Sequence, residues 1–305
     1  YWRSLYRQVL GDAESGDIDE AVAELENSYL SSEQLGSKMV QHADERRIVF
    51  WTTPTFEDRL FLWMGFHAFR ETDVAVNRIA TAEAQAPVPP EDDDFFALRD
   101  LEIEELVEGF DEIVYPEEIY VQAGAQLWQV FSSESPRKFA ISIPHTEKFF
   151  PNIGIIAENY GSMFPVARGK DASGYELSEF DSELLGTLSP ERWQTAFDVL
   201  GAEFVERFHF VDDLAIAARL ASWADYAEEA PYVESRPVDD PPSIFEGREY
   251  RLAERGSELL EKGFSEDDSA PIIELGDCRI YAGAEPWVKV IDGEHWYFER
   301  QSVAR

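Results

Sequence analysis

RRIVFWTTPTFEDRLFLWMGFHAFR, residues 46–70, is the stretch that decides the fold of the first part of this 305-residue chain. Residues 48–51 form an apolar run of β-formers, Thr52-Thr53-Pro54-Thr55 breaks the run, and residues 57–69 then have the composition of a helix. This order predicts a strand, a tight loop and a helix, which is half of an α/β unit. Because the predicted helix is apolar almost all round, we expect it to be buried on more than one side.

Polar side chains gather in the loop of this unit, where the strand ends and the helix begins. Ligands of open α/β sheets collect at the carboxyl ends of strands, beside helix N-termini, so the loop is a candidate site for a phosphorylated or nucleotide-like ligand. The simpler interpretation is a capped helix, with Thr55 as the N-cap and with Asp58 near the positive end of the helix dipole, where Arg3 could pair with it. The candidate ligand-binding residues are Arg3, Trp51, Thr52, Thr53, Thr55, Asp58 and Arg59.

Acidic residues outnumber basic ones by 62 to 26, which gives the chain a formal net charge of −36. Only six of the basic residues are Lys. In molar salt the Debye length is about 3 Å, so the self-repulsion of such a chain is largely screened. The composition therefore predicts a halophilic protein, and the alternative is an acidic protein that docks on a basic partner.

The remaining composition is that of a folded protein with a sizeable core. Hydrophobic residues make up 44% of the chain and aromatic residues 13%, which argues against disorder, and the length predicts two or three domains. The single cysteine, Cys278, excludes an internal disulfide and any multi-thiolate metal site, which fits a cytoplasmic protein. No apolar run has the length of a membrane-spanning helix, so we expect no contact with a membrane.

Sequence motifs of common cofactor and metal sites are missing. The five histidines show neither HxH nor HxxxH spacing, and no glycine-rich nucleotide motif is present, so we expect no metal and no cofactor. His67 lies in the predicted central helix and is expected to be buried and hydrogen-bonded. His145 is expected in a polar loop and is the better catalytic candidate of the two.

The pattern along the chain predicts an α/β fold, α+β overall, in four parts. These are an α/β domain at 1–115, a helical region at 116–173, a winged-helix-like domain at 174–265 and a small β cap at 266–305. Further helices are expected at 17–37, 97–110, 116–131 and 149–160, a second strand at 74–80, and Pro136 is expected to end the segment before it.

Three helices followed by a β-hairpin and another helix are the reason for expecting a winged-helix-like domain. Ser178 should begin the first helix, Ser189 and Pro190 should cap and open the second, which extends to about 204, and 213–227 should form the third. The hairpin is expected to pair 232–234 with 249–252, and a last helix at 255–262 should end at Gly263. Short strands at 279–281, 288–291 and 296–299 complete the β cap.

A winged helix raises the hypothesis of DNA binding through its third helix. The candidate residues for nucleic-acid contact are Arg207, Arg219, Arg236, Arg248 and Arg251. However, residues 203–230 hold seven acidic residues and only two arginines, and such a face repels phosphate. Contact with a protein is therefore favoured over contact with DNA.

The order of these pieces resembles a bacterial family catalogued as domain of unknown function 1835. The resemblance runs through most of the chain, and its matching stretches are Tyr1-Trp2-Arg3, Val49-Phe50-Trp51, Phe56-Glu57-Asp58-Arg59-Leu60, Leu98 to Leu106, Gln126-Leu127-Trp128, Phe164-Pro165, 177–181, Tyr250-Arg251-Leu252, Arg255-Gly256 and Leu259-Leu260. This chain departs from the family where Ser4 replaces an acid and where Thr52-Thr53-Pro54 replace a glutamate-histidine-aspartate cluster. The resemblance brings no established activity with it, and the departures weaken an enzymatic interpretation.

The function expected from the sequence is that of a non-catalytic regulatory or protein-interaction module that binds a protein partner or associates with itself. Two other classes stay open: an enzyme or binder of a phosphorylated ligand at the loop between Trp51 and Arg59, and a winged-helix DNA-binding regulator.

Overall fold

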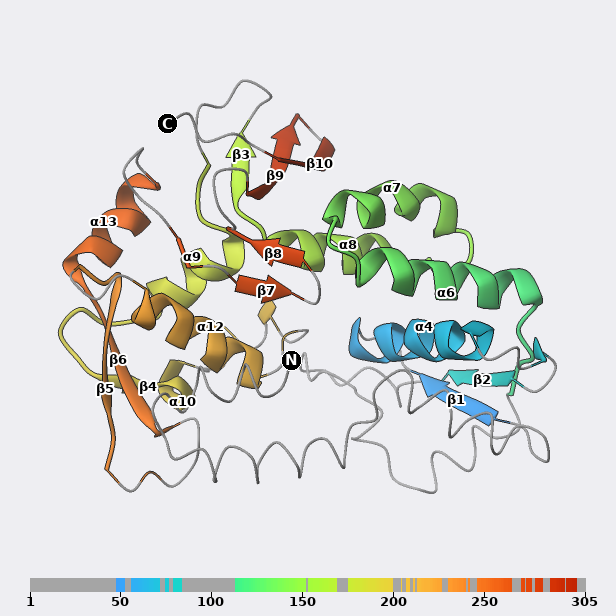
Figure 1. Cartoon of the computed structure of the whole chain (residues 1–305), viewed down its shortest axis with the longest axis horizontal. Helices are drawn as coiled ribbons and strands as arrows, with labels where there is room; N and C mark the ends of the chain where they lie inside the picture. The colour runs from blue at the N-terminus through green and yellow to red at the C-terminus, as the bar shows by residue number, and fades with distance from the viewer. Residues whose placement is uncertain are drawn as a thin grey trace, which may run out of the picture. The chain divides into compact units, whose positions relative to one another are not determined.

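The computed structural model describes the following residues: 48–52, 56–71, 75–76, 79–83, 113–151, 153–168, 175–199, 204, 207–208, 211, 213–226, 230–239, 241, 246–264, 270–271, 273–275, 278–281, 286–293 and 295–300. They form a mixed α/β fold (Figure 1). The chain divides into two compact units. The N-terminal unit holds the described residues of 28–133 and 141–156, and the C-terminal unit those of 134–140 and 157–305. The helices predicted at 17–37 and 97–110 lie outside the described residues.

The N-terminal unit is built on the strand-loop-helix segment that the sequence predicts. Strand β1 (Ile48–Thr52) is followed by helix α4 (Phe56–Glu71) and by strand β2 (Ile79–Glu83). The two strands are parallel, with Ile48 opposite Ile79 and Thr52 opposite Glu83. The second strand was predicted at 74–80, but β2 begins at Ile79 and overlaps the prediction only at its end.

Helix α4 is buried on two sides, as its apolar composition predicts. It lies between the β1–β2 pair and helix α6 (Glu118–Phe131) (Figure 1). The core between these elements holds Phe50, Leu62, Phe66, Phe69, Ile79, Val121 and Ala125. Two glycines allow α4 to pack closely against β1 and α6. A Cβ on Gly65 of α4 would lie 2.4 Å from the Phe50 ring of β1, and a Cβ on Gly124 of α6 would lie 2.5 Å from the Phe66 ring of α4.

The segment before Pro136 ends at Phe131, as the sequence predicts, but Pro136 also begins a helix that the sequence did not predict. Helix α7 (Pro136–Thr146) starts at this proline, which suits the first helical position because its missing N–H would have no partner there. His145 therefore lies in the last turn of α7, exposed, and not in a polar loop. Helix α8 (Ile153–Ser162) follows. The sequence predicts this helix at 149–160, so the observed helix begins later than expected.

The C-terminal unit contains three small sheets. Strand β3 (Val166–Arg168) pairs in parallel with β9 (Trp287–Asp292), and β9 pairs antiparallel with β10 (His295–Arg300) through a turn at Gly293, which has a positive φ of 65°. Strands β7 (Ile273–Leu275) and β8 (Cys278–Ile280) form a hairpin of their own. The sequence predicts the strands β8, β9 and β10 but not β7.

The third sheet belongs to a helix-rich segment. Its elements in chain order are α9 (Glu179–Gly186), β4 (Gln194–Thr195), α10 (Ala196–Val199), α12 (Asp213–Asp225), β5 (Val233–Pro237), β6 (Arg248–Leu252) and α13 (Glu254–Lys262). The strand order is β4-β6-β5, with both pairings antiparallel. The predicted hairpin and the predicted helices at 213–227 and 255–262 are thereby confirmed, as is the end of α13 at Gly263, where φ is 72°.

The expected helix start at Ser189 and Pro190 is wrong. The hydroxyl of Ser189 accepts hydrogen bonds from the backbone N–H groups of Glu191 and Arg192, and the chain then forms strand β4. Helix α10 begins after Thr195, whose hydroxyl accepts the N–H of Asp198 at 3.2 Å while the Asp198 carboxylate accepts the N–H of Thr195 at 2.8 Å. This reciprocal cap, and not the serine-proline pair, is what stabilises the helix start.

Candidate functional site

The loop between Trp51 and Arg59, the first candidate site, falls partly outside the described residues, because Thr53, Thr55 and Arg3 are not among them. Thr52 is buried at 2% exposure at the end of β1, and Trp51 is half-buried. Asp58 and Arg59 are half-buried in the first turns of α4. Binding of a ligand by this loop stays a prediction, and so does the pairing of Asp58 with Arg3.

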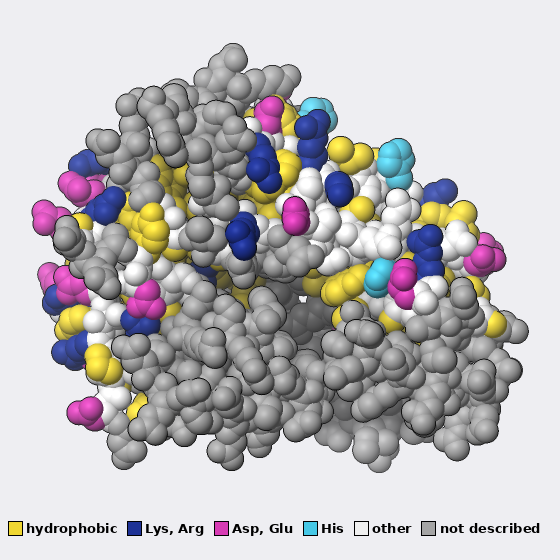
Figure 2. Space-filling view, in the orientation of Figure 1, with side chains coloured by type: hydrophobic (Ala, Val, Ile, Leu, Met, Phe, Trp, Pro, Cys, Tyr) yellow, Lys and Arg dark blue, Asp and Glu magenta, His cyan; other side chains and the backbone are white. Residues whose placement is uncertain are grey.

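The five candidate nucleic-acid residues all lie in the C-terminal unit, and every one of them has a carboxylate partner. Arg207 pairs with Glu179 and Glu183, Arg219 with Asp181, Arg236 with Glu249, Arg248 with Asp225 and Arg251 with Glu234. Figure 2 shows basic and acidic side chains interspersed over the described surface near β5, β6 and α13. Each of the five candidate positive charges therefore already has a carboxylate at short range.

Three of these arginines lie on the β5–β6 hairpin. Arg236 and Arg251 both stack on the ring of Trp193, with their guanidinium carbons 4.4 and 4.7 Å from its centroid. Arg248 donates two hydrogen bonds to the Asp225 carboxylate at the end of α12, at 2.6 and 3.1 Å. Arg248 also lies over the Tyr250 ring, 5.7 Å from its centroid, so each hairpin arginine is held both by a carboxylate and by an aromatic ring.

Helix α12 is buried in its middle, while residues 215, 222 and 224 are half-buried and Asp225 at its end is exposed. Residues 216–221 and Trp223 are all buried. Arg219, at 4% exposure, points into the protein and forms a bidentate ion pair with the fully buried Asp181 of α9. Tyr281 and Phe264 contact Trp223 from the elements that follow the hairpin, so the described middle of the helix faces the protein interior.

The buried Asp181 carboxylate has a complete set of hydrogen-bond donors. Oδ1 accepts from Arg219 Nε at 2.7 Å and from Trp223 Nε1 at 2.9 Å. Oδ2 accepts from Arg219 Nη2 at 2.6 Å, from Ser178 Oγ at 2.6 Å and from the Tyr281 hydroxyl at 2.8 Å. Ser178 caps α9, since its hydroxyl also accepts the N–H of Asp181.

Charge and hydrogen bonding decide the protonation of this network. Burial by itself would raise the pKa of Asp181, but the Arg219 guanidinium and the hydrogen bonds from Arg219, Ser178 and Trp223 hold the pKa below its ordinary value. Burial, with the Asp181 charge beside it, raises the pKa of Tyr281 well above its ordinary value. The network is therefore an ionised pair surrounded by neutral donors, and its chemistry is that of a structural anchor.

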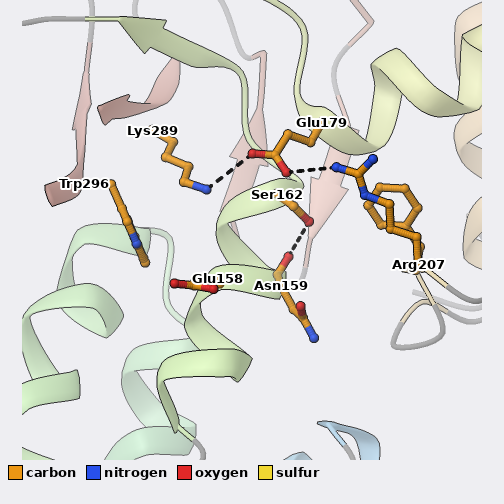
Figure 3. Close-up of a pocket in the computed structure, with 8 residues that line it drawn as sticks. Glu158, Asn159, Ser162, Glu179, Arg207, Lys289 and Trp296 are labelled. Carbon is orange, nitrogen blue, oxygen red and sulfur yellow. Dashed lines mark hydrogen bonds and ion pairs between the residues drawn. The ribbon is translucent and has the colours of Figure 1, made fainter. Parts of the chain in front are cut away.

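A cavity of about 250 Å³ lies beside Glu179 of α9, in the C-terminal unit. Its lining comes from four separate segments and consists of Glu158, Asn159, Ser162, Glu179, Arg207, Phe208, Lys289 and Trp296. Lys289 and Arg207 approach Glu179 from opposite sides (Figure 3). Lys289 Nζ lies 3.7 Å from Glu179 Oε1, and Arg207 Nη2 lies 3.5 Å from Glu179 Oε2.

Lys289 is the unusual residue of this cavity. Only 9% of its side chain is exposed, and a Cβ added to Gly161 on α8 would lie 3.4 Å from its stem. Its ammonium group lies 5.4 Å from the centroid of the Trp296 ring. In the described part of the chain no acceptor lies within hydrogen-bond distance of Nζ, because the Glu179 carboxylate at 3.7 Å is too far.

Sequence reasoning did not find this cavity. The one available signal was Lys289 itself, a charged residue in the apolar run of β9, in a chain with only six lysines. The partners could not be found from sequence, since they meet Lys289 only in the folded unit.

The histidines do not form a site among the described residues. His67 does not have the expected hydrogen bond at Nδ1, which is buried without a partner in the described structure. A search of the described residues for three or more His, Cys, Asp or Glu side chains grouped to hold a metal ion found none. The described helices include none that is both long enough and apolar enough to cross a membrane.

Comparison of the chain with protein-family models, with curated proteins and with solved structures gave no match in any of the three. The resemblance to the family of domain of unknown function 1835 thus stays a prediction.

Proposed function

We propose that this chain is a non-catalytic protein-interaction module, with a winged-helix-like domain at 174–265 that contacts protein and not DNA. The order of helices, a short first strand and a hairpin, together with the strand order β4-β6-β5, supports a winged-helix-like arrangement. The observation that carries the functional part is the pairing of all five candidate arginines with carboxylates.

This pairing and the burial of α12 both disfavour binding to DNA. Binding to DNA gains most of its free energy when unpaired Lys and Arg replace counterions at phosphates, and a paired arginine would first have to leave its carboxylate. The helix that reads a groove in helix-turn-helix proteins is α12 here, and it is buried. The surface that remains carries mixed charges and one prominent apolar side chain, Phe197, which is 67% exposed on α10.

A charge-release experiment tests the DNA part of the proposal. The triple variant Asp225→Asn, Glu234→Gln, Glu249→Gln removes the partners of Arg248, Arg251 and Arg236. A matched control, Glu191→Gln, Glu254→Gln, Glu261→Gln, changes the net charge equally at exposed carboxylates for which the described structure shows no ion pair. Duplex DNA binding is measured by fluorescence anisotropy at 0.1 to 0.5 M salt.

We expect neither the parent nor the control to bind at micromolar concentrations. The charge-release variant should gain affinity with a slope of log K against log salt of roughly −2 to −3, because three freed arginines contribute about −0.9 each. Sub-micromolar binding by the parent would refute the proposal. Equal behaviour of the two triple variants would refute the reason given for it.

The protein-contact part is tested by self-association. Sedimentation velocity of the parent over a hundredfold concentration range in molar salt should show a concentration-dependent oligomer that Phe197→Ser weakens. An unchanged monomer would exclude a second copy of the chain as the partner, and capture of a different protein that Phe197→Ser does not affect would remove α10 from the interface.

A further inference from the structure

The cavity beside Glu179 contains a mostly buried cation, Lys289, for which the described residues supply no acceptor at hydrogen-bond distance. An ammonium group has three N–H donors and, when buried, normally has acceptors for them. Lys289 has a single carboxylate at 3.7 Å and an aromatic ring at 5.4 Å, and its Nζ faces the open volume (Figure 3). Such an arrangement fits a ligand that brings oxygen acceptors to Nζ.

The size of the cavity limits what can enter. A volume of about 250 Å³ corresponds to the liquid volume of roughly eight water molecules. Ligand sites for larger organic molecules have volumes of about 300–1,000 Å³. The occupant should therefore be a small molecule, of about the size of a monosaccharide.

The charges around the cavity disfavour an ionic ligand. Two cations, Lys289 and Arg207, share the lining with the carboxylates of Glu179 and Glu158, and Glu183 adds a further carboxylate that pairs with Arg207. An anion would meet more negative than positive charge in a chain of net charge −36, and a cation would meet the buried ammonium group. A neutral ligand leaves this balance unchanged.

We propose that this cavity binds a neutral polyhydroxylated molecule, a monosaccharide or a cyclic polyol. Lys289 donates to its hydroxyl oxygens, Glu158 and Glu179 accept from its hydroxyl groups, and the face of Trp296 covers its C–H surface. Hydroxyl groups both donate and accept, so one such molecule satisfies donors and acceptors of the lining together. This property goes beyond the proposed protein-interaction function and does not depend on it.

Saturation-transfer difference NMR with the full chain in molar salt tests the proposal. The probes are glucose, galactose, mannose, ribose and myo-inositol, each at 5 mM, with phosphate and citrate in a parallel series. Lys289→Met keeps the length of the side chain and removes the donors. Lys262→Met is the matched control, because Lys262 lies on α13 with 66% of its side chain exposed and outside the cavity.

We expect at least one neutral probe to bind the parent and the Lys262→Met control equally, and Lys289→Met to lose at least tenfold in affinity. Lys289→Met should melt no lower than the parent, since it replaces a poorly hydrogen-bonded buried cation by an apolar group. Should that variant not fold, Glu158→Ala, an exposed change on α8, must show the loss in affinity instead.

Several results would overturn the proposal. They are the absence of a signal for all five neutral probes at 5 mM, tighter binding of phosphate or citrate than of any neutral probe, and unchanged affinity in a folded Lys289→Met variant. None of these results bears on the DNA and sedimentation experiments, so this proposal and the proposed function fail independently.

Discussion

Replacing Asp181 by Asn should destabilise the C-terminal unit more than any change at a surface ion pair. The substitution keeps the shape of the side chain but removes its charge, which leaves the Arg219 guanidinium buried at 4% exposure without a counter-charge. It also places an NH2 group where three donors now converge, from Ser178, Arg219 and Tyr281, at distances of 2.6 to 2.8 Å.

The magnitude follows from these two effects. Removing one partner of a buried ion pair costs about 3–5 kcal/mol, because the remaining charge is uncompensated. Each donor left unsatisfied costs a further 1–3 kcal/mol, although the terms do not add fully because the groups relax together. We therefore expect a loss of at least 3 kcal/mol in the free energy of unfolding. The matched control, Glu258→Gln, breaks the exposed pair with Lys262 and should cost no more than about 1 kcal/mol.

Denaturant unfolding in molar salt measures both values. Tryptophan fluorescence is a suitable probe because Trp223 Nε1 donates directly to Asp181. Adding Arg219→Met to the Asp181→Asn variant should recover part of the loss, since it removes the uncompensated guanidinium. A loss below 1 kcal/mol for Asp181→Asn, or no recovery in the double variant, would show that the pair does not anchor the unit.

The remaining predictions concern salt, pH, backbone space and the thiol. Raising the salt concentration from 0.1 M to above 1 M should raise the melting temperature of the parent, since the Debye length falls from about 10 to 3 Å, and a flat curve would refute the halophilic interpretation. Because the folded pKa of Asp181 lies below the unfolded value of about 3.9, its stabilisation is present above that value and is lost as the pH falls through the folded pKa. The difference in unfolding free energy between parent and Asp181→Asn should therefore shrink on acidification below pH 4, and a constant difference would contradict the pKa direction. Gly256→Ala places a Cβ 2.2 Å from the Tyr232 carbonyl oxygen and should cost about 1–3 kcal/mol, whereas Gly186→Ala, which meets nothing within 4 Å, should be neutral or slightly stabilising by thermal melting. Burial raises the pKa of Cys278 to about 12, so a thiol reagent at pH 8 should leave the native protein unmodified and react with one thiol after denaturation, and rapid native labelling would disagree with the buried position.

Local patterns in the sequence predict the elements that are regular and strongly apolar. The strand and helix around residues 46–70 and the β5–β6 hairpin are confirmed, because their side-chain periodicity matches their burial. The errors arise where a residue has two uses. Pro136 follows the end of a segment as expected but also begins α7, which was not expected, and Ser189 was expected to cap a helix but caps a turn before β4.

The candidate site shows the limit of sequence reasoning more clearly. Arg219 was predicted as a weak nucleic-acid contact because it lies on the third helix, but its partner Asp181 is 38 residues away and the pair is buried. Lys289 was not predicted at all, since much of its cavity is formed by α8, α9 and residues 207–208, which are distant from β9 in sequence. Only the tertiary fold shows which charges are paired and which are not.

The paired arginines of the hairpin also select its strand register. Glu234 lies directly opposite Arg251, and Arg236 lies directly opposite Glu249. A slip of two residues in one direction would place Glu234 opposite Glu249, and a slip in the other direction would place Arg236 opposite Arg251, so both alternatives bring like charges together. Each exposed pair contributes little to stability, but the pattern makes the wrong hairpins unfavourable while the chain folds. Exchanging the charges of both cross-strand pairs should therefore preserve the hairpin, because the slipped registers still bring like charges together, whereas reversing a single charge should admit a shifted hairpin.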